Sequence, residues 1–197
     1  MSDPSRLPLV AGRECGTCQA CCVALTIDKP DIQKMPGSPC RHSLQGGCGI
    51  YENRPNVCQV FFCGWRRLAT MPDDWRPDQS GILVIGETNE LPQFQPLALT
   101  LFLTGNPLKT IRRPDFLDFV IRNVRNKVAL YLMLPGAPGM KSARLHLNDP
   151  LQEAASRARA EVKAVLELSL KMHQALPPQP HVMEHDGHDF STVMVGR

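Results

Sequence analysis

The sequence predicts an α+β protein in which an irregular, cysteine-rich N-terminal module packs on a small sheet with two main helices. Two observations support this prediction. All eight cysteines lie between Cys15 and Cys63, in a segment with little helical or strand periodicity. The remainder has apolar segments in the order strand, strand, helix, strand, strand, helix. The predicted parts are a module at 1–70, a connector at 71–80, an α+β domain at 81–176 and a flexible tail at 177–197.

Short apolar runs bracketed by glycine and proline predict the strands of the α+β domain. These runs lie at 82–85, 97–103 and 129–134, and a fourth strand is expected at 143–147, where apolar and polar residues alternate. The first helix is expected to begin at Pro114, because proline suits the first turn of a helix. Apolar residues then recur at helical spacing, at Leu117, Ile121, Val124 and Val128.

A second, longer helix is expected over residues 150–176. Asp149 can cap its N-terminus, Pro150 suits its first position, and Gln152 completes a capping box with Asp149. Apolar residues then step by four and three along one stripe, and two prolines end the helix after Leu176.

The composition indicates a globular protein rather than a disordered one. Hydrophobic residues make up 43% and charged residues 21% of the 197 residues. The N-terminus lacks the apolar run of a secretory signal, and no segment approaches the roughly 18–20 apolar residues of a membrane helix. We therefore expect a cytoplasmic protein with no membrane contact. In that reducing compartment disulfides are disfavoured.

The first cysteine cluster has the spacing of metal ligands. Two CxxC steps link Cys15, Cys18 and Cys21, and such turns let sulfurs converge on one metal ion. Cys22 follows Cys21 directly, so the two side chains are expected to point apart. One of them then suits a second centre or a buried structural position.

A second, looser cluster follows at Cys40, Cys48, Cys58 and Cys63. Glycines on both sides of Cys48 permit the tight backbone that a metal loop needs. Eight thiolates complete two four-cysteine sites, for about two zinc ions. The rival interpretation is an iron–sulfur cluster that uses four of them. The sequence leaves the metal and the pairing of ligands open.

Several arginines lie among or just beyond these cysteines. Two four-thiolate sites holding divalent metal would carry a charge of about −4 in total. Nearby cations could offset this charge, although ordinary surface positions explain them equally well. The residues concerned are Arg41, Arg54, Arg66 and Arg67.

Taken together, these motifs resemble those of the bacterial CxxCxxCC family, described as zinc- or iron-chelating domains. The matching elements are CGTCQACC and then CRHSLQGGCGIYENRPNVCQVFFC, whose last firm element lies near Cys58. The resemblance implies metal chelation through these cysteines. Some relatives have been linked to protein methylation, but this chain has no glycine-rich loop to hold a methyl donor.

Two further groups of residues suggest binding functions. The C-terminal tail has a cluster at His181, His185 and His188 that suits a divalent metal, although terminal segments of this kind are often mobile. Basic residues around the first predicted helix suit RNA or an acidic protein, or form a solvated surface. These residues are Lys109, Arg112, Arg113, Arg122, Arg125 and Lys127.

The leading interpretation is a metal-binding protein with a structural or redox role that presents a surface to a protein partner. A metalloenzyme, dependent on zinc or iron–sulfur, is the first alternative, because a three-cysteine site keeps an open position. A nucleic-acid adaptor of zinc-ribbon type is the second. The net charge of +3 gives it little support. The residues alone do not decide whether the protein is an enzyme.

Overall fold

The computed structural model describes residues 7–183. It contains both helices and sheets, which confirms the predicted α+β class. The described residues divide into two compact units. The sheet unit consists of residues 7–14, 62–134 and 143–176, and the cysteine unit of residues 15–61, 135–142 and 177–183. Residues 62–80, assigned from the sequence to the module and the connector, therefore belong with the sheet.

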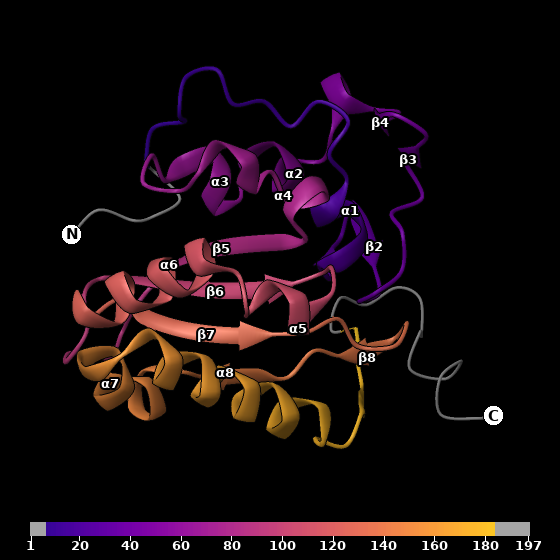
Figure 1. The fold of residues 1–197 in the computed structure, drawn as a ribbon. Helices are drawn as coiled ribbons and strands as arrows, with labels where there is room; N and C mark the ends of the chain where they lie inside the picture. Colours follow the sequence, from indigo (N-terminus) through magenta and orange to yellow (C-terminus); the bar gives the residue numbers. More distant parts are fainter. Residues whose placement is uncertain (1–6, 184–197) are drawn as a thin grey trace. The chain divides into compact units, whose positions relative to one another are not determined.

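A four-stranded sheet with the order β5-β6-β7-β9 organises the sheet unit (Figure 1). Its strands are β5 (Ile82–Thr88), β6 (Leu97–Leu103), β7 (Ala129–Met133) and β9 (Arg144–His146). β5 pairs with β6 and β7 with β9 in antiparallel fashion, whereas β6 and β7 are parallel. The four predicted strands are thus present. Their order could not be read from the sequence.

The first predicted helix is confirmed as α6 (Pro114–Arg125), with Pro114 in its first turn. It lies in the connection between the parallel strands β6 and β7, which cannot be joined by a tight hairpin. The short helix α5 (Pro107–Thr110) precedes it, capped by the side chain of Asn106, which accepts a hydrogen bond from the backbone N–H of Lys109. The buried residues of α6 are all apolar: Phe116, Leu117, Phe119, Val120 and Val124.

The second predicted helix is present as two helices, α7 (Asn148–Arg157) and α8 (Arg159–Gln174). The prediction of a single continuous helix was wrong, because the backbone at Ala158 is extended, with φ −150° and ψ 148°. The predicted start was also wrong by two residues. The buried side chain of Asn148 accepts from the backbone N–H of Leu130 (2.7 Å) and donates to the carbonyl of Val128 (2.8 Å). This tertiary contact places Asn148 inside the helix, so Asp149 is not its cap.

One face of the sheet forms the core together with the helices. Leu101 lies opposite Val84 on one side and Leu132 on the other, so these side chains share a face. They cluster with buried residues of α6, α7 and α8. Trp75, which is fully buried, joins this core with its ring centroid 5.1 Å from that of Phe119. The stretch expected to be a connector thus supplies part of the core.

Arg13 binds the N-terminal segment, residues 7–14, to the rest of the sheet unit. Its buried guanidinium donates to the carbonyls of Trp65 (2.7 Å), Leu68 (3.1 Å) and Met71 (2.6 Å) and pairs with Asp73 (2.7 Å). These contacts hold residues 7–14 beside residues 62–73. The chain therefore enters and leaves the 15–61 segment from one part of the sheet unit.

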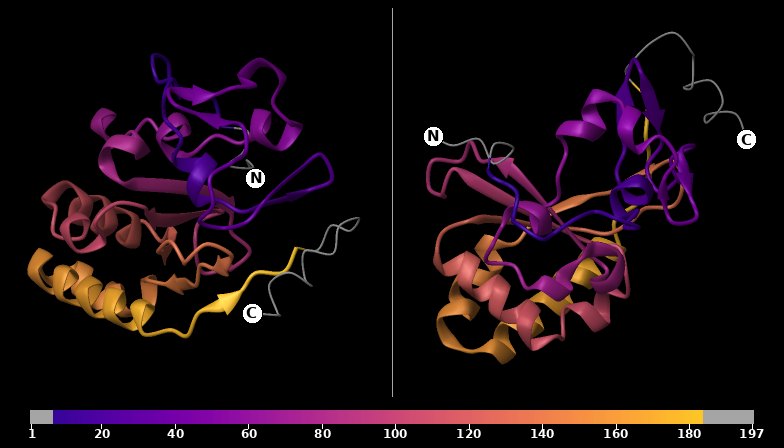
Figure 2. Two further views of the ribbon diagram at one scale, coloured as in Figure 1. Left: turned by 90° about the vertical axis from the view of Figure 1, so that its right-hand side faces the viewer. Right: turned by 90° about the horizontal axis from the view of Figure 1, so that it is seen from above.

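The cysteine unit is built from short elements. Ala24 and Ile32 are the hydrophobic side chains that are buried among its described residues. A segment with so little apolar burial does not offset its ordering entropy through packing alone. Figure 2 shows β10 (Gln179–Pro180), in yellow, where the chain continues from α8. It pairs with β8 (Met140–Lys141). The other elements are α1 (Ala20–Ala24), β1 (Ile27–Lys29), β2 (Ile32–Lys34), β3 (Ser43–Leu44), β4 (Gly47–Cys48), the 3-10 helix η2 (Tyr51–Asn53) and α2 (Asn56–Val60).

Candidate metal centre

Seven of the eight cysteines lie in the cysteine unit. Cys15 and Cys18 precede α1, which holds Cys21 and Cys22; Cys40 precedes β3, Cys48 lies in β4, and Cys58 lies in α2. Each is partly buried, and none forms a disulfide within the described chain. Cys63 differs from the other seven. It lies in the sheet unit, just before α3 (Gly64–Arg67), and packs against the hydrophobic core.

Backbone hydrogen bonds bring the two cysteine clusters of the sequence together. The N–H of Cys18 donates to the carbonyl of Cys15 (2.8 Å) and closes the first CxxC turn. The N–H of Cys40 donates to the carbonyl of Cys22 (2.9 Å), so residues 18 positions apart in the sequence lie side by side. Cys22 and Cys40 therefore belong to one local cluster, although they stand in different clusters along the chain.

Gln19 ties the first CxxC turn to the hairpin that carries Cys48. Its side-chain NH₂ donates to the carbonyls of Leu44 and Gly47, and its side-chain oxygen accepts from the hydroxyl of Ser43. Ser43 pairs with Cys48 in the β3–β4 hairpin. Sequence reasoning missed this residue, because a glutamine between cysteines carries no signal of its own.

Lys34 is the second side chain that sequence reasoning missed. It is only 5% exposed, and its ammonium donates to the carbonyls of Val23 (2.9 Å), Met35 (3.2 Å) and Ser38 (2.8 Å). A signal was present, because Lys34 stands two residues after the buried Ile32 in a strand and so shares its face. Burial lowers the pKa of Lys34, and the nearby thiolates of Cys40, Cys22 and Cys21 oppose that shift.

The thiols are close enough to alter one another's protonation. A hydrogen bond from the Cys21 thiol lowers the pKa of Cys22 to about 7, with help from Lys34 and Arg54 and against the effect of burial. The same hydrogen bond, with burial, raises the pKa of Cys21. Thiolate is the form that binds metal, so the lowered pKa of Cys22 favours its metal-binding form.

The remaining interactions divide the thiols of this unit into two groups. The pKa of Cys58 is raised by burial and then by the charges of Cys22, Cys40 and Cys48. The pKa of Cys21 is raised in addition by the charges of Cys22, Cys15 and Cys18. Cys22 interacts with both sets, which otherwise separate Cys40, Cys48 and Cys58 from Cys15, Cys18 and Cys21.

The donor set fits a soft metal centre, since thiolates select zinc and iron–sulfur clusters over hard cations. In residues 7–183, however, no three Cys, His, Asp or Glu side chains converge tightly enough to surround one ion. The thiols are gathered in one region without yet having a coordination geometry.

Of the arginines expected near the ligands, Arg54 acts on the thiols. It lowers the pKa of Cys22 and opposes the rise in the pKa of Cys58. Its guanidinium lies 3.8 Å from the centroid of the Tyr51 ring and donates to the carbonyl of Tyr51 (2.8 Å). Arg66 and Arg67 belong to the sheet unit, where both lie near the ring of Phe62.

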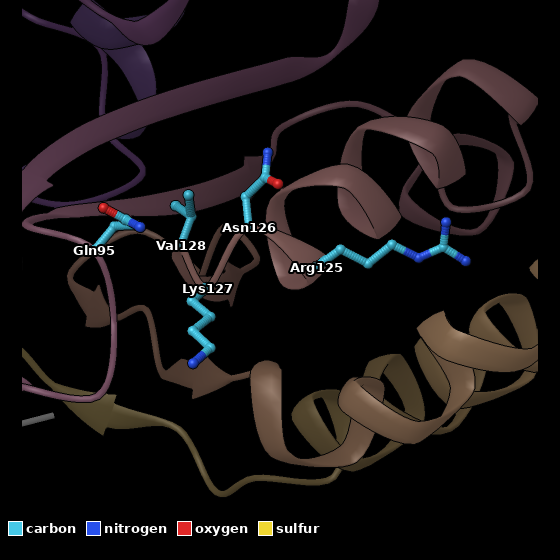
Figure 3. Close-up of a pocket in the computed structure, with 5 residues that line it drawn as sticks. All are labelled: Gln95, Arg125, Asn126, Lys127 and Val128. Atoms are coloured by element: carbon cyan, nitrogen blue, oxygen red, sulfur yellow. The ribbon is translucent and has the colours of Figure 1, made fainter.

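The basic residues near α6 are largely engaged inside the sheet unit. Four of the six bind internal partners: Arg112 with Glu167 (2.8 Å), Arg113 with Asp115 (2.6 Å), Arg122 with the carbonyl of Thr70 (3.2 Å) and Arg125 with the carbonyl of Ala155 (2.9 Å). An open depression lies at the end of α6, lined by Gln95, Arg125, Asn126, Lys127 and Val128. Figure 3 shows Arg125 and Lys127 pointing in different directions, so their charges do not converge on a ligand.

In the histidine cluster of the tail, the structure describes His181 alone. Its backbone N–H donates to the carbonyl of Gly139 (2.9 Å). His185 and His188 lie outside the described residues. The predicted tail site therefore stays a prediction.

No known family model, curated protein or solved structure matches the chain. The resemblance to the CxxCxxCC family accordingly rests on the cysteine motifs. No helix in residues 7–183 combines the length and the apolar character that crossing a membrane requires.

Proposed function

We propose that the protein chelates zinc or an iron–sulfur cluster through its cysteines, as the CxxCxxCC motif implies. One observation carries the proposal: seven thiols are gathered in a unit that buries only two hydrophobic side chains among its described residues. Such a unit needs another source of folding free energy. Structural zinc supplies about 10–16 kcal/mol in small zinc-binding peptides.

Cys58 and the three thiols that interact with it form the proposed closed site. Cys22, Cys40, Cys48 and Cys58 come from α1, the segment before β3, β4 and α2, so a metal held by them would join four short elements. This linkage explains how a unit with little apolar core becomes ordered. Its role is then structural or, with iron, redox.

Cys15, Cys18 and Cys21 favour a second candidate function. Three thiols from this unit leave one position of a tetrahedral centre open, and an open position is what a catalytic metal requires. A metalloenzyme is therefore the alternative to a structural or redox protein. A zinc or iron centre that binds an exogenous thiol or cyanide while still attached to the protein would favour the enzyme.

The proposal includes a cytoplasmic location, because a reducing compartment keeps thiol ligands available for metal. A structural or redox module acts by presenting its surface to another protein, so we propose a protein partner. Four of the basic residues near α6 form ion pairs or hydrogen bonds within the sheet unit, which gives a nucleic-acid partner little support.

Elemental analysis of protein purified without oxygen tests the proposal, together with its visible spectrum. Zinc in the colourless protein indicates a zinc centre. Iron with acid-labile sulfide and visible absorbance indicates a cluster. Protein that carries neither metal and takes up neither after reduction would overturn the proposal.

A further inference from the structure

We propose that Lys34 is a positioning residue of the cysteine site, which supplies a fixed positive charge beside Cys22 and Cys40 and holds their two segments together. The inference rests on the proposed function, because it concerns the same cysteines. It goes beyond the ligands themselves, since nothing in the cysteine motifs involves a lysine.

The hydrogen bonds of Lys34 connect the two segments that carry these ligands. Val23, whose carbonyl accepts one bond (2.9 Å), follows Cys22 in α1. Ser38, whose carbonyl accepts another (2.8 Å), lies two residues before Cys40. The backbone bond from Cys40 to Cys22 (2.9 Å) runs between the same segments. The ammonium is therefore held between the chains of the two ligands.

Burial makes the charge of Lys34 unusual. Lysine is almost never buried unless its charge is paired, because a lone ammonium is costly to remove from water. Lys34 is 5% exposed, and its three N–H groups all donate to carbonyl oxygens. No donor is left over for a carboxylate. Negative charge on Cys40, Cys22 and Cys21 favours the charged form of Lys34.

The proposed metal centre, by contrast, has an excess of negative charge. Four thiolates around a zinc ion carry a net charge of about −2, and a four-iron cluster with four thiolates carries the same charge in its oxidised form. A buried cation beside such a centre lowers its electrostatic cost. Replacing a group that contacts or orients metal ligands commonly changes the metal affinity by about 10–100-fold.

The test compares zinc affinity in four proteins by competition with a chromophoric chelator under reducing conditions. Lys34→Met keeps the length of the side chain and removes the charge. Lys34→Arg keeps the charge and the donors. Lys29→Met is the matched control, because Lys29 lies in the same hairpin, on β1, and is exposed.

We expect Lys34→Met to bind zinc about 10–100-fold more weakly than the wild type. Lys34→Arg should recover most of the loss, and Lys29→Met should match the wild type. If the wild type carries iron instead, Lys34→Met should lower its reduction potential, because a nearby positive charge favours the reduced cluster.

Three results would overturn the role of Lys34. The first is equal affinity of Lys34→Met and the wild type. The second is equal weakness of Lys34→Arg and Lys34→Met, which would show that shape and not charge is needed. The third is an equal loss in Lys29→Met. A wild type that binds neither zinc nor iron would instead refute the proposed function, so the two failures are distinguishable.

Discussion

Cys58 and Cys63 stand five residues apart, yet their surroundings differ. The pKa of Cys58 is raised by burial and by three other thiolates, whereas Cys63 packs against the hydrophobic core of the sheet unit. Sequence alone assigned both as ligands. The local environment, which depends on the fold around each thiol, separates them.

Replacing these two cysteines one at a time tests that difference. Cys58→Ser removes a thiolate from the proposed closed site and should lower the metal content by about one equivalent. Cys63→Ser should leave the metal content unchanged, because Cys63 stands with the sheet unit. Elemental analysis of both variants decides the matter. Loss of metal in Cys63→Ser would contradict this assignment and restore Cys63 as a ligand.

Among the elements, α6 is tied to the residues before β5 by a charged hydrogen-bond network. Asp115 in the first turn of α6 accepts from the indole N–H of Trp75 (2.7 Å) and pairs with Arg113 (2.6 Å). The bond to Arg113 lowers the pKa of Asp115 below its ordinary 3.8, with a further contribution from Trp75. The network stabilises the folded state while the carboxyl is ionised.

Asp115→Asn should therefore destabilise the sheet unit by about 1 kcal/mol near neutral pH, a modest value because the carboxylate is partly exposed. The pKa of Asp115 is lower when folded, so its contribution is full above pH 3.8 and is lost as the pH falls through the folded value. The difference between variant and wild type should accordingly shrink in acid. Denaturant unfolding at several pH values measures it.

The control for this prediction is Asp118→Asn in the same helix. Asp118 pairs with Arg159, and both side chains are more than half exposed. Surface pairs of this kind contribute little, so the free energy of unfolding should hardly change. A loss at Asp118 equal to that at Asp115 would show that Trp75 and Arg113 add nothing.

Elements were predictable from the sequence where periodicity decides them. The runs that became β5, β6, β7 and α6 are apolar and are bounded by glycine or proline, so local pattern and final structure agree. The break at Ala158 and the early start at Asn148 were not predictable in this way. Asn148 enters the helix because its side chain binds the backbone at Val128 and Leu130, which is a contact between distant residues.

The sequence predicted the ligands of the candidate site, but it did not predict the residues that hold the ligand segments in place. Cysteine spacing identifies thiol ligands, because few other patterns place so many sulfurs together. Gln19 has no such pattern, and the alternation that places Lys34 on the same strand face as Ile32 does not reveal its partners. Each acts through carbonyl groups of distant residues, and those partners become evident only once the chain is folded.

Across the whole molecule, the two units depend on different sources of stability. The sheet unit has an extensive apolar core, while the cysteine unit has two buried hydrophobic side chains among its described residues. Metal removal should therefore loosen the cysteine unit and spare the sheet. Hydrogen exchange on protein with and without chelator should show faster exchange at residues 15–61. Amides of β5, β6 and β7 should stay protected.

Uniform loss of protection in both units would show that the sheet also depends on metal. Unchanged exchange at residues 15–61 would show that the cysteine unit is ordered without metal. A chain cut after Met183 provides a control for the tail, because it lacks His185 and His188. It should keep the same metal content and the same exchange pattern as the full chain.

X-ray absorption at the metal edge, on protein as purified without oxygen, tests the central claim most directly. If cysteines hold the metal, its directly bonded neighbours should be mainly sulfur atoms, at about 2.3 Å for zinc, with at most one lighter ligand at an open three-cysteine site. A shell of nitrogen and oxygen atoms at about 2.0–2.2 Å would contradict the cysteine site and direct attention to histidine and carboxylate ligands.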